Sequence, residues 1–230
     1  MEGYDNIGFD NFDPDALAQQ TSEVILFTTV IDTSGSIYGY VDAMNNATRD
    51  LFMKELSGSH KADQIVVKSL EFNDSVIHKS GFMPIKNLPS DYLEVKNAGG
   101  MTALYQGVLE AYENLESYRN DLEDQGIVCK SNIFIVTDGS DNSSPRDAAA
   151  KVKAKIEELR KNESWVNTFT ITMLGVGPDT KMFEKSCREM GLDPSKCLVT
   201  TADPSKDIRK VMGVVSQSVS SSNQAQVVSF

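Results

Sequence analysis

The strongest constraint on the fold of this 230-residue chain is the alternation of apolar runs with segments of helical periodicity. The first run, 24–31, is continuously apolar and β-branched, which is typical of a strand buried on both faces. Further runs predict strands at 65–72, 132–137, 166–174 and 196–200. In the intervening segments apolar residues recur every three or four positions, and this spacing predicts helices.

This alternation predicts an α/β fold with a doubly wound, mostly parallel central sheet and helices on both faces. The run 76–79 follows a polar turn, and we expect it to return antiparallel to the preceding strand as an edge strand. The length fits one domain. We assign 22–218 to that domain, 1–21 to an irregular N-terminal arm, and 219–230 to a flexible C-terminal tail.

Charge and hydropathy argue against two classes of partner. The formal net charge is −11 and the pI is about 4.7, so the surface repels nucleic-acid phosphates and anionic lipid head groups. No apolar stretch approaches the roughly 18 residues of a membrane span. The acidic N-terminus also does not resemble a secretory signal peptide. We therefore expect no nucleic-acid partner and no membrane span.

The chain has three cysteines and two histidines, too few ligands for the usual zinc sites. Cys129, Cys187 and Cys197 form no C-x-x-C pair. Their odd number favours reduced thiols, and we therefore predict a cytoplasmic protein. A Cys187–Cys197 disulfide is the alternative.

Two groups of polar residues directly follow predicted buried strands. Asp32, Ser34 and Ser36 come after the first strand, and Asp138 comes after the strand at 132–137. In doubly wound folds, ligands bind at the carboxyl ends of the strands, where the strand order reverses. If these two strands are neighbours, about 4.8 Å apart, the two carboxylates lie side by side. They then repel each other unless a cation or a shared proton lies between them.

Hard oxygen ligands from Asp and Ser suit Mg²⁺, with Mn²⁺ or Ca²⁺ as alternatives. Each motif also has a local explanation, since Asp-x-Ser-x-Ser alone is more often a capped turn before a helix and Thr-Asp-Gly is a common turn. Their joint position at the ends of two buried strands favours the metal site.

Three segments together resemble the metal-ion-dependent adhesion site (MIDAS) of von Willebrand factor type A domains. They are Asp32-x-Ser34-x-Ser36, Gly99-Gly100-Met101-Thr102-Ala103-Leu104-Tyr105 and Thr137-Asp138-Gly139. The resemblance covers roughly residues 22–218 and implies a Rossmann-like fold. Met101 departs slightly from the pattern, because many relatives carry Thr or Ser there.

The resemblance implies a role for each residue of the site. Ser34 and Ser36 would bind the ion through their hydroxyls, and Thr102 would bind it directly in one state and through water in another. Asp32 and Asp138 would act largely through water or through contacts with the direct ligands. A Glu or Asp carboxylate from a partner protein would fill the open position. For Thr102, capping of the following helix is a local alternative that is compatible with this role.

A binding function fits these residues better than catalysis. A Mg²⁺-dependent hydrolase of the haloacid dehalogenase type needs a second acid two positions after its first Asp, and Ser34 stands there. We therefore predict no enzyme, but a divalent-metal-dependent adaptor or assembly domain that captures a partner carboxylate. A metal-independent scaffold subunit and, less favoured, a Mg²⁺-dependent hydrolase are the alternatives. Intracellular members of the family often act alongside AAA-type ATPases, kinases or phosphatases, which the resemblance makes the expected partner systems.

Other polar and aromatic residues receive structural assignments. We interpret Asp141 as a solvated loop residue, and His60 and His78 as surface residues. Trp165 is expected to pack at a helix-to-strand corner. The resemblance further implies that rearrangement at the site couples to a shift of the last helix, 203–218.

Overall fold

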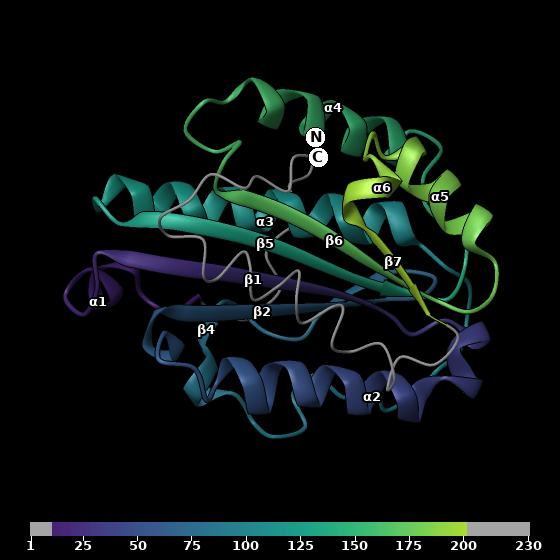
Figure 1. The fold of residues 1–230 in the computed structure, drawn as a ribbon, viewed down its shortest axis with the longest axis horizontal. Coiled ribbons are helices and arrows are strands. Elements are labelled where there is room, and N and C mark those ends of the chain that lie inside the picture. Colours follow the sequence, from purple (N-terminus) through teal and green to yellow (C-terminus); the bar gives the residue numbers. More distant parts are fainter. Residues whose placement is uncertain (1–10, 202–230) are drawn as a thin grey trace.

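The computed structural model describes residues 11–201, with all their side chains except those of residues 47 and 51–53. Its centre is a seven-stranded sheet in the order β3-β2-β1-β5-β6-β7, with β4 also paired to β2 (Figure 1). The strands are β1 (Glu23–Asp32), β2 (Ile65–Phe72), β3 (Val76–His78), β4 (Met83–Pro84), β5 (Val128–Thr137), β6 (Phe169–Val176) and β7 (Leu198–Thr201). Only β3 and β4 run antiparallel to their neighbour among these strands. The predicted fold class is confirmed, and β4 is an addition to it.

Helices cover both faces of the sheet, with α3, α4 and α5 on one side and α2 on the other (Figure 1). The α-helices are α1 (Pro14–Ala18), α2 (Val41–Arg49), α3 (Leu104–Asp124), α4 (Ala148–Lys161), α5 (Thr180–Glu189) and α6 (Pro194–Cys197). A π-helical segment, η2 (Asp50–Leu56), continues α2, and short 3-10 helices form at η1 (Gly35–Gly39), η3 (Ala62–Gln64) and η4 (Ile85–Asn87).

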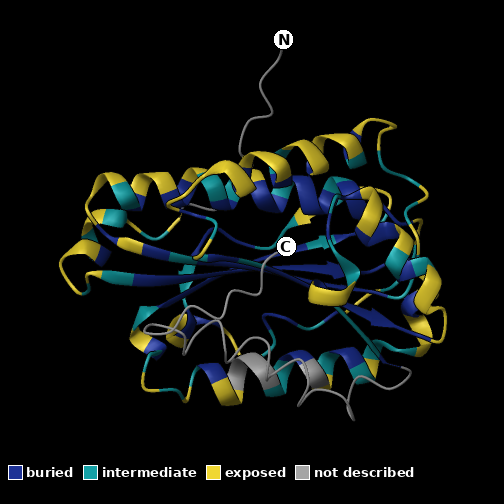
Figure 2. Cartoon of the chain, turned by 45° about the horizontal axis from the view of Figure 1, so that its top comes forward, coloured by how far each residue is buried: buried dark blue, intermediate teal, exposed yellow. Residues whose placement is uncertain are grey.

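The apolar run of β1 supplies two cores at once. Val24 and Leu26 pack into the core beneath α3 and α4, whereas Ile25 and Phe27 pack into the core beneath α2. Every residue of β1 after Glu23 is buried. In Figure 2 the buried residues gather along the strands and the inner faces of the helices. Burial on both faces explains why this strand is continuously apolar.

Two strands begin later than predicted, each for a local reason. β6 begins at Phe169 because the side chain of Asn162 accepts hydrogen bonds from two backbone N–H groups of the next turn, which holds the chain out of the sheet. β7 begins at Leu198 because Asp193 caps the short helix α6 and Pro194 occupies its first position.

The prediction of an irregular arm at 1–21 is wrong for its described part. Asp13 caps α1, and Pro14 occupies the first helical position. Leu17 is buried in the core that α3 covers. Leu17 is the only buried residue within α1 itself, so the sequence has no periodicity that would reveal the helix.

The remaining predictions about the ends of the chain lie outside the described residues. They concern the start of the arm at 1–10, the last helix at 203–218 and the tail at 219–230. Within residues 11–201, no helix has both the length and the apolar character that a membrane crossing requires.

A buried arginine joins α3 to the amino-terminal part of β5 and to the residue that precedes β6. The Arg119 side chain is 2% exposed. It donates hydrogen bonds to Glu123 Oε1 at 2.7 Å, Ser131 Oγ at 3.2 Å and Thr168 Oγ1 at 2.9 Å. Its Cζ atom lies 4.4 Å from the centre of the Trp165 ring. Trp165 is buried in the connection from α4 to β6, which confirms its predicted place at a corner.

Candidate metal site

Asp32 ends β1 at the point where the strand order reverses. β1 has β2 on one side and β5 on the other, and Ile31 pairs with Val136. Asp32 therefore lies beside Thr137, whose Oγ1 donates a hydrogen bond to Asp32 Oδ2 at 2.6 Å. The backbone N–H of Ser34 donates to Asp32 Oδ1 at 2.8 Å. Both oxygens of this fully buried carboxylate are thus held in place.

Three further oxygens form a chain of short contacts. Ser34 Oγ lies 3.0 Å from Ser36 Oγ, and Ser36 Oγ donates a hydrogen bond to Asp138 Oδ1 at 2.8 Å. Ser34 is buried, Asp138 is half-buried and Ser36 is exposed. The oxygens therefore extend from the interior to the surface, where another molecule can reach them.

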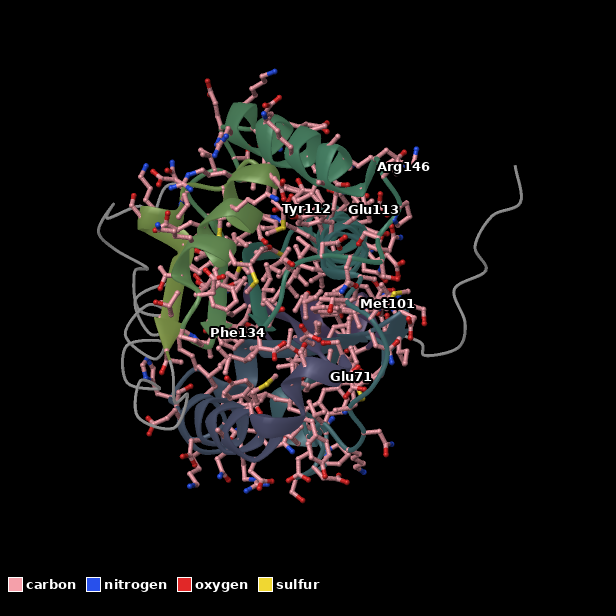
Figure 3. The ribbon with its side chains drawn as sticks, turned by 90° about the vertical axis from the view of Figure 1, so that its right-hand side faces the viewer. Glu71, Met101, Tyr112, Glu113, Phe134 and Arg146 are labelled. Carbon is pink, nitrogen blue, oxygen red and sulfur yellow. The ribbon has the colours of Figure 1, made fainter. Side chains whose placement is uncertain are left out.

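Thr102 approaches the same place from the loop before α3. A Cβ atom built on Gly139 would lie 3.7 Å from Ser36 Oγ and 3.8 Å from Thr102 Oγ1, so both hydroxyls face one point. The structure thus brings together all the residues predicted to form the site: Asp32, Ser34, Ser36, Thr102 and Asp138. Figure 3 views the molecule from this end of the sheet.

The paired glycines let the loop before α3 lie against the first motif. Gly99 N donates to Thr33 O at 2.9 Å, and Gly35 N donates to Gly100 O at 3.1 Å. Gly100 has a φ of +83°, and a Cβ atom there would lie 2.1 Å from Asp74 Oδ2. Only glycine fits this position. The turn between β2 and β3 therefore fixes the shape of the loop.

The loop after β5 makes contacts that sequence reasoning missed. Asp141 Oδ2 accepts a hydrogen bond from Tyr105 N at 3.0 Å, and Ser144 Oγ accepts one from Gln106 N at 2.9 Å. Both contacts cap the amino end of α3, so Asp141 is not the solvated residue that we predicted. Asp and Ser are common capping residues. Here they cap a helix that is distant in sequence. The residue types alone therefore suggest a capping role, and no local motif identifies the helix that is capped.

Thr102 does not cap α3 with its hydroxyl. The capping position is Ala103, which makes no side-chain hydrogen bond there. The backbone of Thr102 instead donates to Asn142 Oδ1 at 2.8 Å and accepts from Asn142 N at 2.9 Å. The capping alternative is therefore wrong. The loop after β5 holds the Thr102 backbone while its hydroxyl faces the site.

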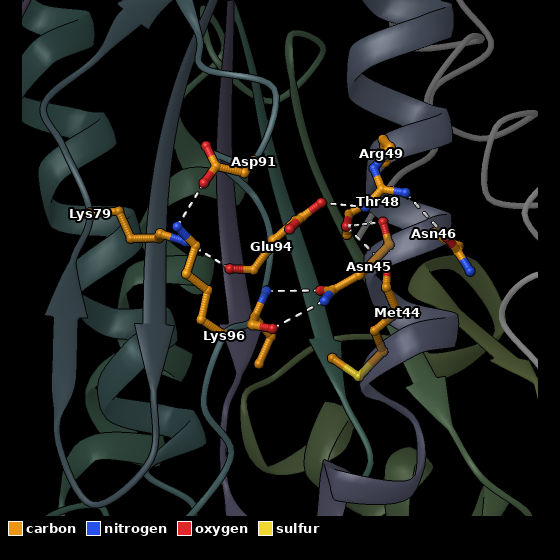
Figure 4. A network of polar contacts seen from close by, with 10 residues as sticks. Met44, Asn45, Asn46, Thr48, Arg49, Lys79, Asp91, Glu94 and Lys96 are labelled. Carbon is orange, nitrogen blue, oxygen red and sulfur yellow. Dashed lines mark hydrogen bonds and ion pairs between the residues drawn. The ribbon is translucent and has the colours of Figure 1, made fainter.

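A polar network ties the chain before Gly99 to α2 (Figure 4). Asn45 Nδ2 donates to Val95 O at 3.0 Å, and Asn45 Oδ1 accepts from Val95 N at 2.8 Å. Arg49 forms an ion pair with Glu94, whose backbone oxygen accepts from the side chain of Lys79 at 3.1 Å. The helix α2 follows the loop that contains Ser34 and Ser36, and the segment at Glu94 and Val95 leads to the loop that contains Thr102. The network therefore connects the supports of two loops of the site.

Oxygen, and not nitrogen or sulfur, dominates the site. Across residues 11–201, no three His, Cys, Asp or Glu side chains form a cluster suited to a metal ion. His60 is exposed, as predicted. His78, also predicted at the surface, is half-buried, and its Nε2 lies 2.9 Å from Glu110 Oε2. An ion at the site would therefore need hydroxyl ligands besides the two carboxylates.

Burial makes both carboxylates of the site costly to ionise. It raises the pKa of Asp138 to about 6, the hydrogen bond from Ser36 opposes this rise, and the negative charge of Asp32 adds to it. Burial also raises the pKa of Asp32, against hydrogen bonds from Thr137 and Ser34. Neighbouring carboxylates of this kind are stabilised by a cation or a proton.

The spacing of the oxygens fits a small dication. Two oxygens bound side by side to octahedral Mg²⁺, each about 2.1 Å from the ion, lie about 3.0 Å apart. The separation of Ser34 Oγ and Ser36 Oγ, the two hydroxyls expected to bind an ion directly, is 3.0 Å. Carboxylate and hydroxyl oxygens are also the donors that hard cations prefer. The residues present fit a divalent cation.

Comparisons with known proteins concern the fold that carries this site. The family model described as von Willebrand factor type A domain matches residues 27–213. No curated protein matches the chain.

Several solved structures share the fold at low sequence identity. Proximal thread matrix protein 1 from the mussel byssus, with a zinc-occupied MIDAS motif, has a TM-score of 0.59 and 17% identity over 84% of this chain and 46% of that chain. The PilB minor pilin from Streptococcus sanguinis has a TM-score of 0.59 and 14% identity, over 87% of this chain and 62% of that one. The SpaC pilus adhesin from Lactobacillus rhamnosus GG has a TM-score of 0.61 and 12% identity, over 87% and 30%. The chain spans less than two thirds of each of these proteins.

Proposed function

Because this chain belongs to the von Willebrand factor type A family, we propose that it is a divalent-metal-dependent protein-binding domain. Its partner supplies an acidic side chain to the ion, and the domain acts as an adaptor or assembly module and not as an enzyme. The observation that carries the proposal is the chain of oxygens from Ser34 Oγ through Ser36 Oγ to Asp138 Oδ1, with separations of 3.0 and 2.8 Å.

Each residue of the site has a role in this proposal. Ser34, Ser36 and Thr102 hold the ion through their hydroxyls, while Asp32 and Asp138 balance its charge largely through water. Asp32 also orients the first loop, because it accepts the backbone hydrogen bond of Ser34. The bound ion supplies an electrophilic position for a carboxylate. The exposure of Ser36 supports approach from solvent.

Mg²⁺ is the ion that we propose, with Mn²⁺ and Ca²⁺ as alternatives, because the donors are hard oxygens. The zinc in the MIDAS motif of the mussel protein supports a divalent cation at a site of this kind without choosing among ions.

We further propose that the protein is cytoplasmic and that its partner belongs to an AAA-type ATPase, kinase or phosphatase system. Support for the location comes from the cysteines. Cys129, Cys187 and Cys197 are buried free thiols, and the Sγ of Cys197 donates a hydrogen bond to the Sγ of Cys187 at 3.8 Å instead of forming a disulfide with it. Free thiols are typical of reducing compartments.

Thermal melts with Mg²⁺ and with EDTA at matched ionic strength test the proposed function. A ligand of the native state at 100 times its Kd stabilises a protein by about 2.7 kcal/mol. For a domain of this size we therefore expect the Tm to be higher in Mg²⁺ by roughly 5–10 °C. Coincident melts at millimolar Mg²⁺ would contradict the proposal and favour a metal-independent scaffold.

The raised pKa of Asp138, about 6, predicts that acidification raises the stability of the metal-free protein but lowers its affinity for Mg²⁺. An unfolded Asp titrates near pH 3.9, so the folded metal-free protein holds this proton more tightly. The contribution of Asp138 to stability is therefore lost as pH rises through about 6, and the Tm in EDTA should gain from acidification between pH 7 and 5. Because the proton competes with the ion, Mg²⁺ affinity should fall below pH 6. Calorimetric titrations and melts check both trends, and Asp138→Asn should remove the gain in EDTA.

A further inference from the structure

Two exposed apolar side chains belong to the loops of the candidate metal site. Among the described residues, the exposed large apolar side chains are Tyr38 at 81%, Val128 at 57%, Met101 at 51% and Ile77 at 46%. Single exposed apolar residues are common. Tyr38, however, comes two residues after Ser36, and Met101 directly precedes Thr102. Two of these four side chains are therefore close in sequence to residues of the candidate metal site.

The loop that leads to Tyr38 packs against the loop that carries Met101. A Cβ atom on Gly35 would lie 3.5 Å from Gly100 O, so Gly35 faces the loop that precedes α3. In a 3-10 helix, side chains three residues apart point the same way. Tyr38 follows Gly35 by three residues within η1, so its Cα–Cβ bond has roughly the direction of the side of Gly35 that faces this loop.

The side chain of Met101 is exposed, while its backbone is fixed by a hydrogen bond and its neighbour Thr102 is buried. Its backbone N–H donates to Asp74 Oδ1 at 3.2 Å, and the following Thr102 is buried. Figure 3, viewed from the carboxyl ends of the strands, shows the Met101 side chain at the surface. Both apolar side chains are thus exposed, and in the chain they lie next to Ser36 and Thr102, whose hydroxyls face one point of the site.

We propose that Tyr38 and Met101 form an apolar rim that selects a partner segment in which apolar side chains flank the acidic residue. The inference rests on the proposed function, because it concerns the partner of the same site. A carboxylate that reaches the ion beside Ser36 enters between these loops, so its neighbouring residues cover the rim. Tyrosine and methionine offer adaptable contact area for such neighbours.

Three capped pentapeptides test the rim by calorimetry on the full chain in saturating Mg²⁺. Their central residues are Leu-Asp-Leu, Ser-Asp-Ser and Leu-Asn-Leu. We expect Leu-Asp-Leu to bind roughly fivefold to tenfold more tightly than Ser-Asp-Ser, because its leucines bury apolar area on the rim. Leu-Asn-Leu lacks the carboxylate and should bind far more weakly, and EDTA should abolish binding of both aspartate peptides.

Matched variants assign the preference to the rim. Tyr38→Ser and Met101→Ser should bring the two aspartate peptides toward equal affinity without changing Mg²⁺ affinity or Tm, since both side chains are exposed. Val128→Ser is the control, because Val128 is similarly exposed but starts β5 at the opposite end of the sheet. If the unmodified chain binds the two aspartate peptides equally, the proposal that the rim selects the partner is contradicted, and the proposed function is unaffected. Failure of both to bind in a Mg²⁺-dependent manner would overturn the two together.

Discussion

Replacing Asp32 with asparagine is expected to weaken Mg²⁺ binding by roughly 10- to 100-fold while the fold stays intact. Asparagine has the size of aspartate, and its oxygen can still accept the hydrogen bond from Ser34 N. Its amide group can donate to Thr137 Oγ1, which now donates to Asp32. The variant therefore keeps the shape of the loop and loses only the charge that balances the ion.

Two measurements separate loss of charge from loss of structure. Calorimetry gives the Mg²⁺ affinity, and melts in EDTA give the stability of the metal-free protein. Because burial raises the pKa of Asp32, removing its charge should leave the Tm in EDTA unchanged or higher. Asp147→Asn is the control, since it removes the same charge from an exposed residue at the start of α4. Unchanged Mg²⁺ affinity in Asp32→Asn would remove this carboxylate from the site.

The largest effect on stability is expected from Arg119→Ala, which should lower the free energy of unfolding by about 3 kcal/mol. The substitution removes the hydrogen bonds to Ser131 and Thr168 and the contact with the Trp165 ring. It also leaves a cavity between α3 and the sheet. Glu123 is one-third exposed, so water can replace part of its lost partner.

Urea denaturation measures this change as a lower midpoint at an unchanged m-value. Arg188→Ala is the matched control. It also breaks an ion pair four residues apart on a helix, but that pair with Glu184 is exposed, and the expected loss is below about 0.5 kcal/mol. Similar losses in the two variants would show that burial of Arg119 adds nothing to its contribution.

The strands of the sheet were predictable because they depend on local patterns, whereas the meeting of the candidate site residues also required a strand order. The first strand, predicted at 24–31, occupies Glu23–Asp32, and the second, predicted at 65–72, has those bounds. Once the strand order placed β1 beside β5, the polar residues that follow these strands had to meet. The convergence of Asp32 with Asp138 follows from that order.

The contacts that we did not predict depend on which loops meet in space. The capping of α3 by Asp141 and Ser144 joins segments more than 30 residues apart. Asn45 bonds both backbone groups of Val95 across a similar gap. The strand β4 is two residues long and contains proline, so it carries no alternating pattern. Contacts of this kind leave no periodic signal in a single chain.

The central place of β1 also sets the order in which the domain can come apart. Proteins open locally from their least protected parts, and the amides of the innermost strand exchange with solvent only when the whole domain unfolds. The short strands β3 and β4 lie at one margin, while β1 is enclosed by β2, β5 and apolar layers on both faces. The loop that begins at Asp32 therefore follows the strand that unfolds last. Local unfolding of β3 and β4 would leave this strand folded.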